Sequence, residues 1–194
     1  MATDRLAAVL TAIDNINAQD PNQTLVDSKP QPKELIYAQQ MTATLAQHWP
    51  DADELLQIAV HGQHIKRWSV KRDEYELGKA GYLKWRKALA VLHADLTQSI
   101  MLAEGYDDTQ AAQTGAVIRK EKLRSDPRAQ TLEDVACLVF LSHNLGEFAA
   151  KHDDAKVIDI LQKTWRKMSD KGHEITLSVK LADDLAALVN KALA

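Results

Sequence analysis

The chain contains few residues of the kinds that define disulfide-rich or membrane-spanning proteins. Its 194 residues include one cysteine, seven glycines and five prolines. A single cysteine cannot form an internal disulfide framework, and Cys137 lies in an apolar run, as expected for a small core residue in a reducing compartment. No apolar run approaches the roughly 20 residues that cross a bilayer. We therefore expect a cytoplasmic protein that has no membrane partner.

An excess of positive charge is also missing. The chain has 24 Lys and Arg residues against 27 Asp and Glu residues, which gives a formal net charge of −3. This balance argues against a protein that coats nucleic acid, so we expect no nucleic-acid partner. The hydrophobic fraction of 45% is high enough to build a buried core. At this length we predict a single domain over residues 1–194.

Apolar residues recur at helical spacing through most of the chain, and no alternating strand pattern is present. The sequence therefore predicts an all-α fold, a single compact helical domain of about eight helices. An extended loop over 20–32 carries three prolines, and a charged loop covers 70–80. The expected helices cover about 3–18, 33–48, 51–68, 81–104, 109–124, 132–151, 154–169 and 172–193.

The third predicted helix carries two histidines at a spacing that suits a metal site. Side chains three apart lie about 60° apart around a helix, so His61 and His64 can face one point. Further ligands would come from His93, in the fourth helix, and from Glu133 and Asp134, which open the most apolar helix. Carboxylates there are costly unless they cap, pair or bind a cation. We predict a divalent metal ion, of unassigned identity, held by these five side chains.

Each of these residues also has a purely structural interpretation. The HxxH spacing alone is a weak signal, and a lone histidine such as His93 on an apolar face is more often a hydrogen-bonded core residue. Glu133 and Asp134 could be first-turn charges that the helix dipole favours. The metal site therefore depends on all of these side chains meeting.

Basic and aromatic residues alternate around the charged loop. Guanidinium groups and aromatic faces together suit a phosphorylated or ring-bearing ligand, so a small anionic molecule is the expected partner. The alternative is a solvated basic face with aromatic residues in the core. Arg86 lies two helical turns before His93 and could stabilise charge on a metal-bound phosphate ester, which makes Arg86 and Glu133 the candidate catalytic residues. The candidate binding residues are Arg67, Trp68, Arg72, Tyr75, Tyr82, Trp85 and Arg86.

An ordered set of short motifs supports a family resemblance. The motifs are His61-Gly-Gln-His-Ile-Lys-Arg-Trp68, Gly81-Tyr-Leu-Lys-Trp-Arg86, Gln130-Thr-Leu-Glu-Asp-Val135 and Lys163-Thr-Trp165. They resemble an uncharacterised family, domain of unknown function 4202. Some members of that family carry an automatic label of glutamyl-tRNA synthetase. This chain has no nucleotide-binding βαβ pattern and is too short for that enzyme.

A weaker similarity is to the HD superfamily of helical, metal-dependent phosphohydrolases, and it implies an HD-like bundle. Those enzymes hold a metal with a His, a His-Asp doublet and a later Asp. Here the doublet is broken because Ala94 follows His93. Asp95 comes one position later, about 200° around the helix from His93, and cannot replace the missing ligand.

Three functions follow as hypotheses. The first is a metal-dependent hydrolase acting on a small phosphorylated or anionic substrate. The second is a non-catalytic module whose basic aromatic pocket binds a small molecule or an acidic partner segment. The third is a helical scaffold, in which the amphipathic stretch 172–193 docks between subunits of a homodimer.

Overall fold

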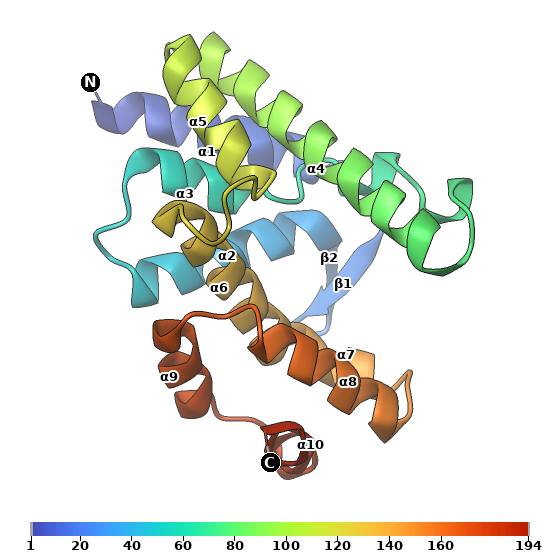
Figure 1. Ribbon diagram of the computed structural model, residues 1–194. Coiled ribbons are helices and arrows are strands. Elements are labelled where there is room, and N and C mark those ends of the chain that lie inside the picture. The colour runs from blue at the N-terminus through green and yellow to red at the C-terminus, as the bar shows by residue number, and fades with distance from the viewer. Residues whose placement is uncertain (1, 194) are drawn as a thin grey trace. The chain divides into compact units, whose positions relative to one another are not determined.

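Helices dominate the computed structural model, which describes residues 2–193, with side chains over 5–193 (Figure 1). Ten α-helices, two 3-10 turns, one π-helical turn and one two-stranded sheet are its regular elements in that range, which confirms the all-α class. None of the helices described there is long and apolar enough to span a bilayer. The chain divides into two compact units, Met1–Ala129 and Gln130–Ala194, and each is described separately.

The first unit contains five of the helices. α1, α3, α4 and α5 share a core that includes Val9, Ile58 and Met101. In Figure 1, α5 runs back alongside α4. Buried, evenly spaced aliphatic residues on α1 and α4 explain why these segments form helices in this context. The bounds are α1 (Ala2–Asn17), α2 (Lys33–His48), α3 (Glu54–Gly62), α4 (Gly78–Ala103) and α5 (Asp108–Ile118), with single 3-10 turns at Arg67–Ser69 and Arg72–Glu74.

A short hairpin replaces part of the predicted extended loop. β1 (Gln23–Val26) pairs antiparallel with β2 (Lys29–Pro32). Asp27 and Ser28 both have positive φ, 49° and 63°, as a two-residue hairpin turn requires. We predicted no strand here because the sequence has no alternating apolar run. A two-stranded hairpin has only edge strands, where proline is tolerated, and so it forms without that pattern.

The third helix is shorter than its apolar pattern predicts. α3 begins after Asp53, which caps the helix by accepting a hydrogen bond from the Leu56 N–H, so its start lies later than the predicted 51. The helix ends at Gly62 rather than at 68. Lys66 then adopts a left-handed conformation, with φ 53°, and donates its N–H to Asn17 Oδ1 at 3.0 Å. This turn redirects the chain immediately after His64.

Helix α6 is rich in buried residues, among them Leu132, Val135 and Leu138, as its apolar run predicts. A π-helical turn at Phe140–Asn144 separates α6 from α7, and the predicted helix over 172–193 is broken between Ser178 and Asp183. A second core forms from the later helices and includes Leu145 and Leu161. The bounds are α6 (Pro127–Val139), α7 (Leu145–Ala149), α8 (Asp154–Trp165), α9 (Asp170–Ser178) and α10 (Asp183–Leu193).

Candidate functional site

The first unit contains a basic cavity of about 410 Å³, formed by the turn after α3, the middle of α4 and the segment after α5. This volume lies in the range of small-molecule sites. Part of its wall is apolar and includes Leu89 and Ile118. Glu121 is the only carboxylate that lines it among the described residues, and this group is paired with Arg119 at 2.6 Å. The cations of the lining are Arg67, Arg86, Lys87, Arg119 and Lys120.

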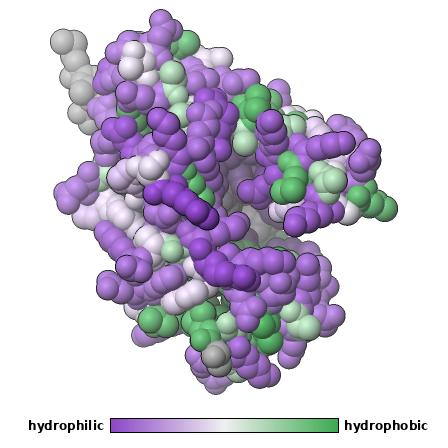
Figure 2. Space-filling model, in the orientation of Figure 1, coloured by the Kyte–Doolittle hydropathy of each residue, from purple (hydrophilic) through white to green (hydrophobic). Residues whose placement is uncertain are grey.

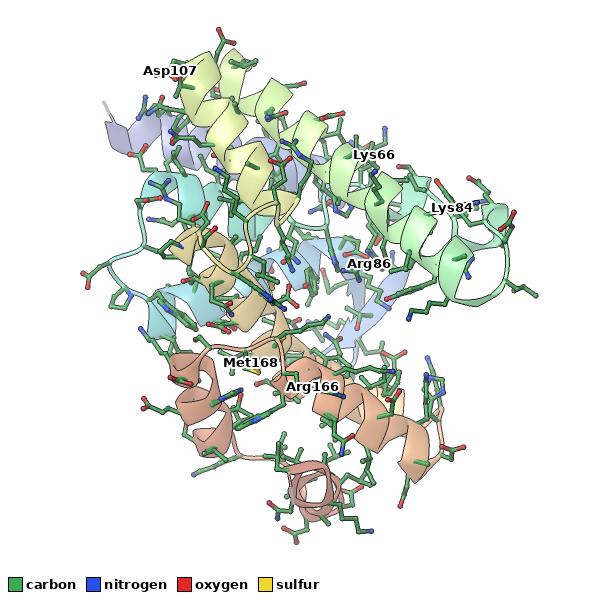
Figure 3. All side chains as sticks on the ribbon, in the orientation of Figure 1. Lys66, Lys84, Arg86, Asp107, Arg166 and Met168 are labelled. Atoms are coloured by element: carbon green, nitrogen blue, oxygen red, sulfur yellow. The ribbon has the colours of Figure 1, made fainter. Side chains whose placement is uncertain are left out.

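Arg86 and Lys87 are the cations most available to a ligand. Both are exposed, and neither forms an ion pair within the described part of the chain. Figure 3 labels Arg86 on α4 and Lys84 closer to the start of the same helix. Lys84 does not line the cavity, and its Nζ lies 3.7 Å from Glu76 Oε2. The two residues therefore offer a matched comparison on one helix.

A carboxylate and an imidazole meet beside this cavity. Glu34, in the first turn of α2, places Oε2 3.1 Å from His64 Nδ1. The ring of Tyr37, one turn later on α2, stacks on the imidazole at 4.1 Å between centroids and 13° between planes. These two contacts fix the position and the plane of His64. We missed Glu34 in the sequence, where its one signal is a carboxylate at the start of an amphipathic helix.

Burial changes the protonation of this pair. It raises the pKa of Glu34 to about 7, and the nearby Arg67 and Lys33 only partly oppose that shift. Burial also lowers the pKa of His64 well below its ordinary value, and the positive charges of Arg67 and Arg86 add to the effect. The imidazole is therefore neutral at neutral pH, and it lines a cavity rich in cations.

His93 on α4 is the second imidazole of the cavity. Its ring centroid lies 5.7 Å from that of His64, and the residue is only 3% exposed. Burial lowers its pKa well below the ordinary value, the charges of His64 and Arg67 lower it further, and a hydrogen bond to the Gln63 backbone opposes them. Its Nε2 has no hydrogen-bond partner among the described residues. The same holds for Oε1 of the buried Gln63, which also lines the cavity.

His61 does not share this site. Its Nε2 lies 2.9 Å from Asp14 Oδ1 and its Nδ1 lies 2.8 Å from Thr42 Oγ1, so both ring nitrogens have partners. The residue is 4% exposed. The prediction that one helix directs His61 and His64 to one point is wrong, because α3 ends at Gly62.

The two predicted carboxylate ligands belong to the second unit. Asp134 accepts hydrogen bonds from the N–H of Ser169 at 2.9 Å, from its hydroxyl at 2.6 Å and from Gln130 Nε2 at 3.0 Å. Glu133 lies 3.5 Å from Lys167 Nζ. Across residues 5–193, no group of three or more His, Cys, Asp or Glu side chains is placed to hold a metal ion. The five predicted ligands are thus divided among different local environments.

Of the predicted binding residues, Arg67 and Arg86 line the cavity. The guanidinium carbon of Arg67 lies 4.8 Å from the centroid of the Trp85 ring. Its Nε lies 3.9 Å from Glu34 Oε1. Trp85 donates its indole N–H to Val70 O, which holds the ring that Arg67 stacks on. The other predicted residues do not line the cavity; they are Trp68, Arg72, Tyr75 and Tyr82. Lys87, Arg119 and Lys120 do, and we had not predicted them as ligand-binding residues.

Arg72 and the aromatic residues near it have structural or surface roles. Arg72 donates to the carbonyl oxygens of Tyr75 and Glu76, both at 3.0 Å, and so closes the loop before α4. Tyr82 is 44% exposed at the start of α4. Leu77, just before α4, and Leu83, in its first turns, are also exposed. Figure 2 shows hydrophobic residues in green at this end of α4. None of these residues lines the cavity.

The family model for the domain of unknown function DUF4202 matches residues 7–189. The chain belongs to this family. The DUF4202 match includes every residue of the cavity and both histidines that line it. Searches of the curated proteins and of the solved structures found no match. The description of DUF4202 names no activity, so a proposal for function has to come from the cavity itself.

Proposed function

We propose that the first unit binds a small phosphorylated molecule in its basic cavity. The observation that carries this proposal is that five cationic side chains line one cavity of about 410 Å³ against a single carboxylate. Guanidinium groups such as those of Arg67 and Arg86 bind phosphate oxygens in pairs, and ammonium groups bind them as point charges. A phosphate is the small group that best neutralises such a set.

The rest of the lining suits the body of such a ligand. Leu89 and Ile118 are buried apolar residues, and Val91 is 41% exposed beside the cations. A phosphate salt alone would leave this apolar wall in contact with water. A sugar-sized or nucleotide-sized group attached to the phosphate would cover it, and the volume is sufficient for one.

Binding can be tested by isothermal titration and thermal shift with inorganic phosphate, pyrophosphate, glucose 6-phosphate and adenosine monophosphate. We expect at least one of them to stabilise the protein, by an amount that rises with the logarithm of its concentration above Kd. Arg86→Ala should weaken that binding about tenfold or more, equivalent to about 1.4 kcal/mol. Lys84→Ala, on the same helix but outside the cavity, should leave the affinity unchanged. Equal losses in both variants, or no binding of any of the four anions, would contradict the proposal.

The metal-dependent hydrolase is the second candidate. Of the five predicted metal ligands, His64 and His93 lie together in the cavity lining, with ring centroids 5.7 Å apart. The same titrations repeated with Mn²⁺ or Zn²⁺ test it. Metal binding that His64→Ala and His93→Ala each abolish would favour the hydrolase, because the simple binding module needs no metal.

A further inference from the structure

Two buried acceptor atoms in the cavity lining have no partner among the described residues. They are His93 Nε2 and Gln63 Oε1, on residues that are 3% and 6% exposed. A buried polar atom that lacks a hydrogen bond costs stability, and such atoms are therefore uncommon in folded proteins. Both atoms belong to residues that line one cavity, which makes a ligand held there the candidate donor to them.

The hydrogen bonding of His93 defines what its free nitrogen can do. The hydrogen bond to the Gln63 backbone raises the pKa of this imidazole, so the ring donates to the Gln63 carbonyl. Because Nε2 has no partner, the donor must be Nδ1–H. A neutral imidazole carries one proton, so Nε2 keeps its lone pair and is an acceptor. Gln63 Oε1 is an acceptor by its chemistry.

We propose that the ligand of this cavity is a hydroxyl-bearing phosphate ester, of the sugar phosphate or polyol phosphate class. The phosphate lies against the cations, and hydroxyl groups donate to His93 Nε2 and Gln63 Oε1. This inference rests on the proposed function. It adds the requirement that the ligand carry hydrogen-bond donors besides its charge.

The cations and the two acceptor atoms of the lining bind different groups of a ligand. Arg and Lys side chains are donors only, so they bind phosphate oxygens but offer nothing to a hydroxyl proton. His93 Nε2 and Gln63 Oε1 offer only lone pairs, which repel phosphate oxygens and attract O–H groups. A site built to accept a hydroxyl proton rejects an analogue without one, because its buried acceptors then stay unpaired.

The test compares two probes that differ only in hydroxyl groups. Glycerol 3-phosphate and propyl phosphate carry the same phosphate and the same number of carbons. We expect glycerol 3-phosphate to bind at least tenfold more tightly in isothermal titration. Equal affinities would overturn the inference while leaving the proposed function intact. Failure of both probes, of inorganic phosphate and of the sugar phosphate and nucleotide would instead overturn the proposed function.

A variant gives an independent readout. Gln63→Leu removes the unpartnered oxygen and keeps a similar volume, so we expect the ligand-free protein to unfold at a higher urea concentration. The same variant should bind propyl phosphate as the wild type does and should lose most of its preference for glycerol 3-phosphate. Gln98→Leu is the control, because Gln98 Nε2 donates to Ala111 O, and its loss should lower the urea midpoint. If Gln63→Leu also lowers the midpoint and keeps the preference, the inference is wrong.

Discussion

Oε2 of Glu34 lies 3.1 Å from Nδ1 of His64, a residue thirty positions later in the chain. The contact joins the first turn of α2 to the turn that follows α3. Tyr37 stacks on the same imidazole from the next turn of α2. Through these contacts, a helix that does not line the cavity positions one of the two histidines that do.

Glu34 should make stability depend on pH. Its pKa is about 7 in the fold against an ordinary value of 4.5, so the folded state holds a proton that the unfolded state has lost between these values. The stability from this group is present below pH 4.5 and is lost as the pH rises through 7. Relative to wild type, the free energy of unfolding of Glu34→Gln should therefore rise by about 1–3 kcal/mol between pH 4.5 and 8.

Urea unfolding at pH 4.5, 6 and 8 measures this difference. Glu121→Gln is the control, because it makes the same change at a carboxylate that is 50% exposed. A wild-type minus Glu34→Gln difference that stays constant from pH 4.5 to 8 would show that folding does not raise the pKa of Glu34.

His61 and His64 should respond differently to removal. His61→Ala leaves Asp14 and Thr42 without their partner and opens a gap at a residue that is 4% exposed, so it should cost about 1–3 kcal/mol. Its effect on phosphate binding should be small. His64→Ala should weaken binding of the best phosphate ligand severalfold, because His64 lines the cavity. Urea unfolding and titration of both variants separate the two roles, and the reverse pattern would place the ligand at His61.

Gly62 should resist substitution because α4 packs against it closely. A Cβ at this position would lie 2.5 Å from Thr97 Oγ1, which is closer than non-bonded atoms allow. Gly62→Ala should therefore cost about 1–3 kcal/mol. The Thr97 hydroxyl has no partner among residues 5–193. Thr97→Ala should therefore cost less stability than the loss of a buried hydroxyl that forms a hydrogen bond. The double variant should recover most of the loss, and additive losses in urea unfolding would refute the close contact.

Asp134 should act on stability and not on ligand binding. It receives three hydrogen bonds, two of them from Ser169, the residue that caps α9. Asp134→Ala should cost about 2–3 kcal/mol because the buried donors around it lose a charged acceptor. Asp159→Ala, an exposed carboxylate on α8, should cost little. A fall in phosphate affinity for Asp134→Ala at unchanged stability would instead favour its predicted role as a metal ligand.

Local signals in the sequence predict much of the helical framework. The bounds of α2 agree with the prediction at both ends, because Pro32 precedes it and the Trp49-Pro50 dipeptide follows it. The apolar run around Cys137 predicts a buried helix, and α6 is buried. These features depend on residues close together in the chain, where spacing and capping are sufficient.

The cavity could not be predicted in the same way. α3 ends at Gly62, and the chain then turns at the left-handed backbone of Lys66, a residue that carries no sequence signal for that conformation. Glu34 meets His64 only after α2 packs beside α3, and the cations of the segment after α5 reach the cavity only through the packing of α5 on α4. The HxxH spacing was misleading because it assumed a continuous helix through a turn.

The position of Lys66 has a practical consequence for handling the protein. Asn17 accepts the Lys66 N–H, and Asp14 lies 2.9 Å from His61 Nε2, so two side chains of α1 hold both sides of the segment that carries His64. Neither residue lines the cavity. An affinity tag or a fusion partner that disturbs α1 would therefore weaken the proposed ligand binding without touching the ligand, whereas a tag at the carboxyl end leaves these two contacts intact.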